Sequence, residues 1–277
     1  MDTGDDGPGG KKSHGNMKLG DLLEGEYLTD ILVILSHVTG KGKAWILSHL
    51  DAELPRDLFL KAKDLISQRK SGMPLAYLTK RKEFMGIEFH IEPGVFIPRP
   101  ETETLVEFAI KLIREKGFNV VADVGCGSGA IAVSIAKYSG VKVLATDISL
   151  KAVELTIQNA RMQEVEELVE VRRGEFLEPF KERLKEIQLV ISNPPYVEPE
   201  YELPLELRHE PREAFFYGES SVSFYEEFSK RYRGMNFTVA MEFSGKDKDK
   251  KIIGQLFKDV VFIKDLDKVE RFFIGCV

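Results

Sequence analysis

Three glycines at alternate positions form a pattern that could wrap a ligand. They lie in the stretch Asp123-Val-Gly125-Cys-Gly127-Ser-Gly129, directly after a short apolar run. A glycine backbone can turn sharply and approach a ligand where any side chain would collide, and the amides at the start of a following helix point into the same space. The pattern indicates a ligand site, although a tight strand-to-helix turn would use the same residues.

An acidic residue, Asp147, ends the next apolar run, 18 residues after Gly129 (147 minus 129). A carboxylate at this place can accept two hydrogen bonds from the diol of a ribose. The glycine loop and Asp147 together therefore predict a ligand that contains ribose. The alternative is that Asp147 caps a helix that begins near Leu150.

The stretch Asn193-Pro194-Pro195-Tyr196 follows the fourth expected strand, residues 189–192. Two consecutive prolines lack N–H groups, so their carbonyls are presented without competing donors. A planar NH₂ group could donate one hydrogen to the Asn193 side-chain oxygen and the other to the Pro194 carbonyl, while the Tyr196 ring offers a flat surface. The alternative is a proline loop that merely ends a strand.

Such an acceptor pair suits the chemistry of an amide or an exocyclic amine. An amide nitrogen is a poor nucleophile because its lone pair is delocalised into the carbonyl. Holding both of its protons in acceptors favours pyramidalisation and aims the lone pair at an electrophile. Catalysis would then consist of orientation and electrostatics, with no activated Ser, Cys or metal.

The elements that must position these residues alternate regularly along the chain. Short apolar strands alternating with amphipathic helices predict an α/β fold with a mostly parallel sheet covered on both faces. The expected strands are 120–124, 141–146, 169–172, 189–192, 237–242, 260–264 and 270–275, and the expected helices are 101–115, 130–138, 150–161, 180–186, 222–233 and 249–257.

The chain divides into four parts by composition and pattern. Residues 1–16 are rich in glycine and predict a disordered tail, and residues 17–80 show helical apolar spacing that predicts a small helical domain. Residues 81–97 alternate aromatic and β-branched side chains around Gly86 and Pro93-Gly94, which predicts a β-hairpin linker. Residues 98–277 form the predicted catalytic domain.

Charge and cysteine content narrow the class of function. The 277 residues carry 39 Lys and Arg against 45 Asp and Glu, a net charge of -6, so the broad positive field of a nucleic-acid binder is missing. Cys126 and Cys276 are far apart and near no His cluster, which indicates neither a disulfide framework nor a metal site. We expect a cytoplasmic protein without an export signal, a membrane anchor or a direct nucleic-acid partner.

Three motifs carry a resemblance to a known family. The Gly125 to Gly129 loop resembles the first motif of class I methyltransferases, and Asn193 to Tyr196 looks like the (N/D)PPY motif of amino-methyltransferases. The stretch Ile97-Pro-Arg-Pro-Glu-Thr-Glu103 resembles the segment ahead of the catalytic domain in HemK-type release factor glutamine methyltransferases. The similarity covers the chain from about residue 25 to its end and implies a Rossmann-like sheet with one antiparallel strand.

The resemblance implies a cofactor, a substrate and a set of site residues. The cofactor would be S-adenosylmethionine, leaving S-adenosylhomocysteine, and the substrate would be the glutamine in the GGQ loop of a peptide chain release factor, recognised with help from the helical domain. Asn193, Pro194 and Tyr196 would be catalytic, with Pro195 also binding substrate. The implied cofactor-binding residues are Asp123, Gly125, Cys126, Gly127, Ser128, Gly129, Asp147, Phe176 and Asn193.

Two of these residues have a second interpretation, and several positions depart from the family pattern. Asp123 would lie near the ammonium of the ligand or brace the loop, and Phe176 would lie beside the adenine or belong to the core. Glu175 replaces a usual Asp. Residues Tyr217, Ser220-Ser221 and Glu242-Phe-Ser-Gly245 also differ, which affects the expected rim of the substrate site.

Two other functions remain open at this level. An adenine amino-methyltransferase acting on DNA or RNA would use the same proline loop with a flipped base, but would want a basic groove. A non-catalytic module would keep the fold and use its helical domain to dock a partner.

Overall fold

The computed structural model describes residues 17–25, 27–265 and 267–277. The predicted disordered tail, residues 1–16, lies outside these ranges. The chain divides into two compact units between Thr79 and Lys80, and each unit is described by itself below. No helix in the described ranges is both long and apolar enough to span a membrane.

The first unit is helical and has its own apolar core. Ile31, Ile34 and Leu35 recur at helical spacing on one helix and are fully buried. That helix ends at Gly40, whose φ of 68° is the left-handed conformation that favours glycine at a helix terminus. The elements are a short 3₁₀ turn, η1 (Leu19–Leu22), and the helices α1 (Leu28–Thr39), α2 (Lys43–Ser48), α3 (Arg56–Lys70) and α4 (Leu75–Thr79).

One aromatic contact lies at the edge of this unit. The single tryptophan of the chain, Trp45 in α2, stacks on His49 with ring centroids 4.3 Å apart and remains 36% exposed. Elsewhere in the unit, Arg69 of α3 donates to Asp30 of α1 across 2.6 Å. The second contact joins the two longest helices of the unit.

The second unit is built on a seven-stranded sheet with the order β5-β4-β3-β6-β7-β9-β8. Strand β9 is antiparallel to both of its neighbours, and the pairs among β3 to β7 are parallel. The predicted sheet with one antiparallel strand is therefore confirmed. The strands are β3 (Val120–Val124), β4 (Lys142–Asp147), β5 (Val169–Arg173), β6 (Leu189–Ser192), β7 (Thr238–Glu242), β8 (Lys258–Lys264) and β9 (Glu270–Cys276).

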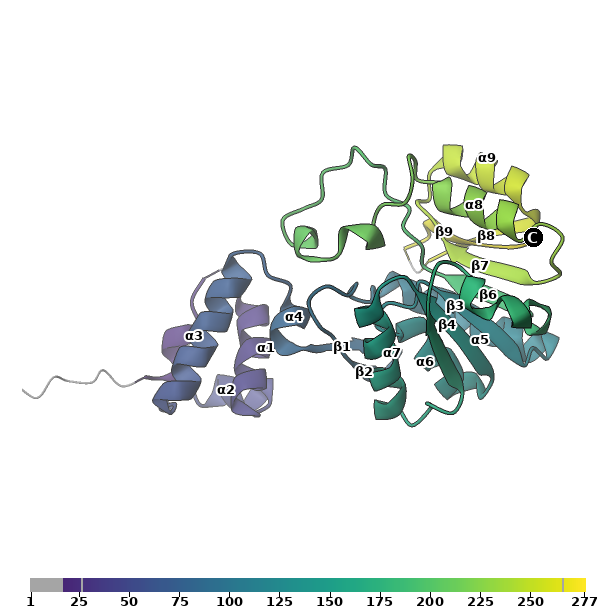
Figure 1. The fold of residues 1–277 in the computed structure, drawn as a ribbon. Coiled ribbons are helices and arrows are strands. Elements are labelled where there is room, and N and C mark those ends of the chain that lie inside the picture. Colours follow the sequence, from purple (N-terminus) through teal and green to yellow (C-terminus); the bar gives the residue numbers. More distant parts are fainter. Residues whose placement is uncertain (1–16, 26, 266) are drawn as a thin grey trace, which may run out of the picture. The chain divides into compact units, whose positions relative to one another are not determined.

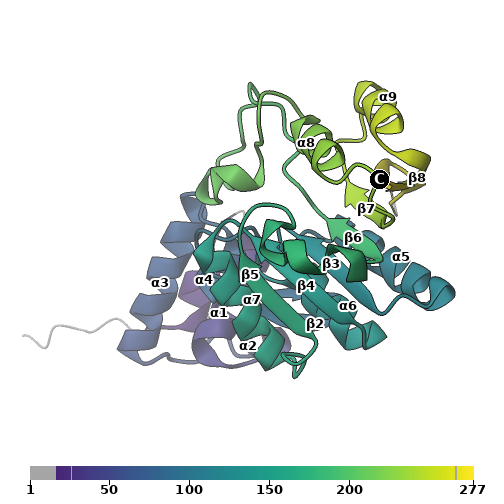
Figure 2. The same cartoon turned by 45° about the vertical axis from the view of Figure 1, so that its right-hand side comes forward.

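Helices cover both faces of this sheet (Figures 1 and 2). The sheet residues Ala122 and Val124 face a buried aromatic cluster that includes Phe176, Phe224 and Phe228. Helices α8 and α9 close that face, and α5, α6 and α7 pack side by side on the other. The helices are α5 (Glu101–Lys116), α6 (Ala130–Ser139), α7 (Leu150–Met162), α8 (Ser223–Arg231) and α9 (Asp247–Leu256), with a 3₁₀ helix η2 (Glu178–Glu186).

A β-hairpin opens the second unit, with strands β1 (Arg81–Phe84) and β2 (Ile87–His90). The Asn159 side chain of α7 accepts from the backbone N–H of His90 at 2.8 Å and donates to its carbonyl at 2.9 Å. The hairpin is thus held to α7 by a two-way amide contact. The paired strands stop at His90, and the remaining residues of the predicted hairpin continue without a partner strand toward the site described next.

Candidate active site

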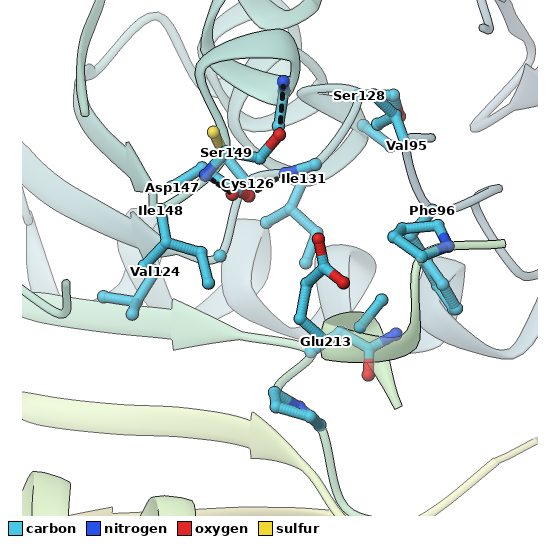
Figure 3. Close-up of a pocket in the computed structure, with 18 of the residues that line it drawn as sticks. Val95, Phe96, Val124, Cys126, Ser128, Ile131, Asp147, Ile148, Ser149 and Glu213 are labelled. Carbon is cyan, nitrogen blue, oxygen red and sulfur yellow. Dashed lines mark hydrogen bonds between the residues drawn. The ribbon is translucent and has the colours of Figure 1, made fainter. Parts of the chain in front are cut away.

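A cavity opens at the carboxyl ends of β3, β4 and β6 (Figure 3). Counted out to its open mouth, and with the solvent space there included, it contains about 1140 Å³ of empty space. Its walls come from the glycine loop, the ends of three strands, the stretch 94–102 and the stretch 211–217. Segments far apart in sequence therefore meet at the edge of the sheet where both motifs were expected to lie.

The glycine loop lines this cavity with backbone. Gly125 and Gly127 have φ of 77° and 55°, and a Cβ built on either residue meets no protein atom within 4 Å. The space in front of these glycines is the cavity itself. Cys126 and Ser128 complete the loop wall. The loop therefore forms a cradle that a side chain would fill, as close backbone approach to a ligand requires.

Two other residues of the loop face the protein. A Cβ on Gly129 would lie 2.8 Å from Thr156 Cγ2, so this glycine permits close packing of α6 against α7. Asp123 is fully buried, does not line the cavity, and accepts the N–H of Ala132 at 3.0 Å. Of the two interpretations of Asp123, this geometry favours bracing of the loop.

Asp147 reaches the cavity from the end of β4. Its two carboxylate oxygens accept the N–H of Gly127 and of Ser149, each at 2.9 Å (Figure 3). Burial raises the pKa of Asp147, and these backbone hydrogen bonds oppose that rise. Ser149, and not Asp147, is the N-cap of α7. Each oxygen retains a lone pair for a hydroxyl donor, since a carboxylate oxygen accepts more than one hydrogen bond.

The charged residues around the cavity suit a cationic ligand. The lining residues include three carboxylates, Asp147, Glu175 and Glu213. The basic side chain among them is Arg99, which is itself paired with Glu210. An acidic wall of this kind favours a positively charged sulfur and an ammonium group. The glycine cradle, the free acceptor capacity of Asp147 and the acidic wall together fit S-adenosylmethionine.

Aromatic residues form the wall of the cavity next to Glu175. Phe176 lines the cavity but is only 3% exposed, and it packs on Phe224 at a centroid distance of 4.9 Å. It therefore borders the cavity and the core at once. The Tyr217 hydroxyl donates to Glu175 at 3.1 Å, and Arg231 bonds the second oxygen of Glu175 at 2.9 Å. Two of the departures from the family pattern, Glu175 and Tyr217, thus contact each other.

The proline loop reaches the same cavity. Asn193 and Pro195 line it, whereas Pro194 and Tyr196 are not among the lining residues. Tyr196 instead donates its hydroxyl to Glu242 at 2.6 Å, and burial together with this carboxylate raises the Tyr196 pKa well above its usual value. The Asn193 side chain donates to the hydroxyl of Thr102 at 3.1 Å. Of this stretch, Asn193 and Pro195 therefore line the cavity, whereas Tyr196 is bound to a carboxylate outside it.

Sequence reasoning assigned no role to several residues that hold this site. Thr102 and Glu242 contact the proline loop, and Arg99 and Glu210 form an ion pair that joins the stretch 94–102 to the segment before Glu213. Arg99, Thr102 and Glu242 lie in quoted motifs or at a strand end, whereas Glu210 does not. The pairing was hidden because Arg99 and Glu210 are 111 residues apart, and Thr102 and Glu242 are 140 residues apart.

The fold and the site define a class I S-adenosylmethionine-dependent methyltransferase. The model of the family described as "Methyltransferase small domain" matches residues 86–208, and the model of the family described as "PrmC N-terminal domain" matches residues 15–79. The chain is 38% identical over 204 residues to a release factor glutamine methyltransferase of Clostridium acetobutylicum, covering 72% of this chain and 71% of the relative. A relative with the same name from Clostridium botulinum is 33% identical and covers 89% and 91%. The chain belongs to the release factor glutamine methyltransferase family.

Solved structures support the fold. The human Mettl16 catalytic domain in complex with an MAT2A 3'UTR hairpin matches with a TM-score of 0.54 at 12% identity, over 79% of this chain and 81% of that one. A structure described as human methyltransferase 10 domain containing protein matches with a TM-score of 0.50 at 16% identity, over 77% and 97%. The expected family, fold class and methyl donor are confirmed.

Proposed function

We propose that this protein transfers a methyl group from S-adenosylmethionine to the side-chain amide nitrogen of a glutamine in a peptide chain release factor, within its GGQ loop. The observation that carries the proposal is a shared cavity. Asn193 and Pro195 line the same space as Gly125, Gly127 and Asp147. Because the substrate would be a translation factor, we propose that the protein acts in the cytoplasm.

The cofactor-binding roles follow from the walls of the cavity. The backbone from Gly125 to Ser128 would face the methionine part, and Asp147 would accept from the ribose hydroxyls. Phe176 would border the adenine, with Glu175 beside it. When bound, S-adenosylmethionine supplies an electrophilic methyl group on a positively charged sulfur. Asp123 and Gly129 would support the loop without touching the cofactor.

The proline loop would orient the glutamine amide. The Asn193 side-chain oxygen would accept one amide proton and the Pro194 carbonyl the other, which aims the nitrogen lone pair at the methyl carbon. The hydroxyl of Tyr196 is bound to Glu242, so its ring is held in place and would form a flat support. After transfer the surplus proton on nitrogen would leave to water, so the residues need not include a general base.

The nature of the substrate is supported by family membership. The matched relatives are named release factor glutamine methyltransferases. The match with the Clostridium botulinum relative extends over 89% of this chain. The N-terminal unit, which has its own core, is the candidate for recognising a large protein partner. The nucleic-acid amino-methyltransferase and the non-catalytic module are not favoured.

The test is mass spectrometry of a release factor incubated with the enzyme and S-adenosylmethionine. We expect a gain of about 14 Da that fragment spectra place on the GGQ glutamine. Asn193→Ala should reduce the rate by about 100-fold or more while the cofactor still binds, because one acceptor of the amide is lost. No mass gain with the unmodified enzyme, or full activity in the Asn193 variant, would contradict the proposal.

A further inference from the structure

A buried carboxylate lies behind the proline loop and outside the cavity. Glu242, at the end of β7, is 2% exposed. Its Oε1 accepts the Tyr196 hydroxyl at 2.6 Å, and its Oε2 accepts the Thr102 hydroxyl at 2.8 Å. A buried ionised carboxylate is strongly unfavourable unless hydrogen-bonded, and here each oxygen has a hydroxyl donor. The carboxylate therefore joins α5, β7 and the proline loop.

The direction of these hydrogen bonds decides how Asn193 is presented. A threonine hydroxyl has one proton, and Thr102 gives it to Glu242. Toward Asn193 the Thr102 oxygen can then only accept, and it receives the Asn193 Nδ2–H at 3.1 Å. If the amide were turned over, two oxygens without a shared proton would face each other. The amide nitrogen must therefore point to Thr102, and Oδ1 is left at the other end of the amide.

We propose that Glu242, acting through Thr102, fixes the orientation of the Asn193 amide so that its oxygen faces the substrate. This inference depends on the proposed role of Asn193 as an acceptor for the glutamine NH₂ group. Glu242 and Thr102 are then positioning residues. Neither takes a proton from the substrate, and their effect is to keep an acceptor, and not a donor, opposite the substrate amide.

Replacing the carboxylate by an amide should reverse the chain of hydrogen bonds. In Glu242→Gln the new oxygen can still accept from Tyr196, and the new NH₂ group would donate to Thr102. Thr102 would then donate its own proton to Asn193 Oδ1, and the Asn193 NH₂ group would turn toward the cavity. The Asn193 NH₂ group would then face the NH₂ group of the substrate glutamine. The substrate would lose an acceptor although the Asn193 side chain itself is unchanged.

The experiment compares Glu242→Gln, Thr102→Val and Thr102→Ser with the unmodified full-length enzyme. We expect kcat for release factor methylation to fall about 10- to 100-fold in the first two variants and to recover in Thr102→Ser, which keeps the hydroxyl. Calorimetric affinity for S-adenosylhomocysteine should stay within about threefold, because the glycine loop and Asp147 are untouched. Ser229→Ala in α8 is the matched control, since it removes a buried hydroxyl that donates to the Leu256 carbonyl in α9.

A second readout does not depend on activity. In protein with ¹⁵N-labelled asparagine side chains, the Asn193 NH₂ protons should exchange with water faster in Glu242→Gln and Thr102→Val than in the unmodified enzyme and Thr102→Ser. Equal exchange in all four proteins, or a Thr102→Ser variant as slow in kcat as Thr102→Val, would overturn the inference. An unmodified enzyme that leaves the release factor unmethylated would defeat the proposed function alone, because the exchange comparison still decides this point.

Discussion

Two carboxylates at neighbouring strand ends have different surroundings, and this difference separates their roles. Burial raises the pKa of Asp123 to about 8. Its Oδ2 accepts one backbone N–H, whereas its Oδ1 has no hydrogen-bond partner within the described part of the chain. Asp147 lies at the cavity, with a backbone donor on each oxygen. Asp147 is thus suited to remain an acceptor for a ligand, and Asp123 to remain a buried brace.

The raised pKa of Asp123 predicts a pH-dependent difference in stability. A folded-state pKa of about 8 against an ordinary 3.8 means that the folded protein retains the proton longer, so stability is lost as pH rises from about 4 to 8. Asp123→Asn cannot ionise. We therefore expect the melting temperature of this variant, relative to the unmodified protein, to rise steadily between pH 5 and pH 8. The corresponding difference in the free energy of unfolding changes by at most about 1.4 kcal/mol per pH unit.

Differential scanning calorimetry of both proteins across this pH range provides the measurement. Asp247→Asn is the control, because the Asp247 side chain is 90% exposed. A constant difference in melting temperature between the unmodified protein and Asp123→Asn would show that Asp123 does not titrate in this window.

At the scale of the elements, two glycines of one loop should respond differently to the same substitution. Gly127→Ala and Gly129→Ala both place a side chain at positive φ, which costs about 1–2 kcal/mol. Only the Gly129 methyl would also collide with Thr156, whereas the Gly127 methyl would project into the cavity. We expect Gly129→Ala to lower the melting temperature more and Gly127→Ala to lower the affinity for S-adenosylhomocysteine more. Thermal melts and calorimetric titrations of both variants check this reversal, and equal affinity in Gly127→Ala and the unmodified protein would refute it.

A partly buried ion pair helps to hold the segment between the proline loop and α8. Glu210 accepts from Arg99 and from the Ile97 N–H, and burial raises its pKa although Arg99 opposes the rise. Removing this carboxylate leaves two donors without their acceptor, at a cost of about 1–3 kcal/mol. We expect Glu210→Ala to loosen the segment and to accelerate tryptic cleavage at the exposed Arg208 and Arg212.

Gel analysis of timed trypsin digests measures that effect. Glu202→Ala, at an exposed position in the same segment, is the matched control. Equal cleavage rates in Glu210→Ala and the control would mean that other contacts hold the segment.

The elements themselves were largely predictable from pattern. Strand 189–192 was predicted with its observed bounds, and the helix from Ala130 was one residue short at its end, because apolar spacing and Gly140 mark those limits. The helix expected near residues 180–186 is a longer 3₁₀ helix, interrupted at Phe180 by a φ of -116°. The Phe180 ring is fully buried, so its packing determines the backbone conformation at this residue.

The site was predictable only where its residues are close in sequence. The glycine loop and the proline loop can each be recognised from a short run of unusual residues. The bond between Thr102 and Glu242 spans 140 residues, and the bond between Arg99 and Glu210 spans 111. Such pairs depend on which strands become neighbours in the sheet, and local propensity does not encode that choice.

At the scale of the whole molecule, the two units should be separable in function. The second unit has its own sheet and buried core and contains every residue that lines the cavity. We expect a chain limited to Lys80–Val277 to unfold cooperatively and to bind S-adenosylhomocysteine with the affinity of the full chain. Its kcat/KM for a release factor should fall at least about tenfold, because the candidate recognition unit is missing. Calorimetry and steady-state methylation assays measure both, and an unchanged kcat/KM would remove the first unit from substrate recognition.

Trp45, which stacks on His49, provides a fluorescence signal that is specific to the first unit. Since the chain has one indole, its emission originates from a single helical turn of the first unit. Titrating S-adenosylhomocysteine, the nucleoside ligand of the second unit, should leave the tryptophan emission unchanged. Adding the protein substrate should alter it, so a cuvette measurement can distinguish which half of the enzyme each ligand reaches.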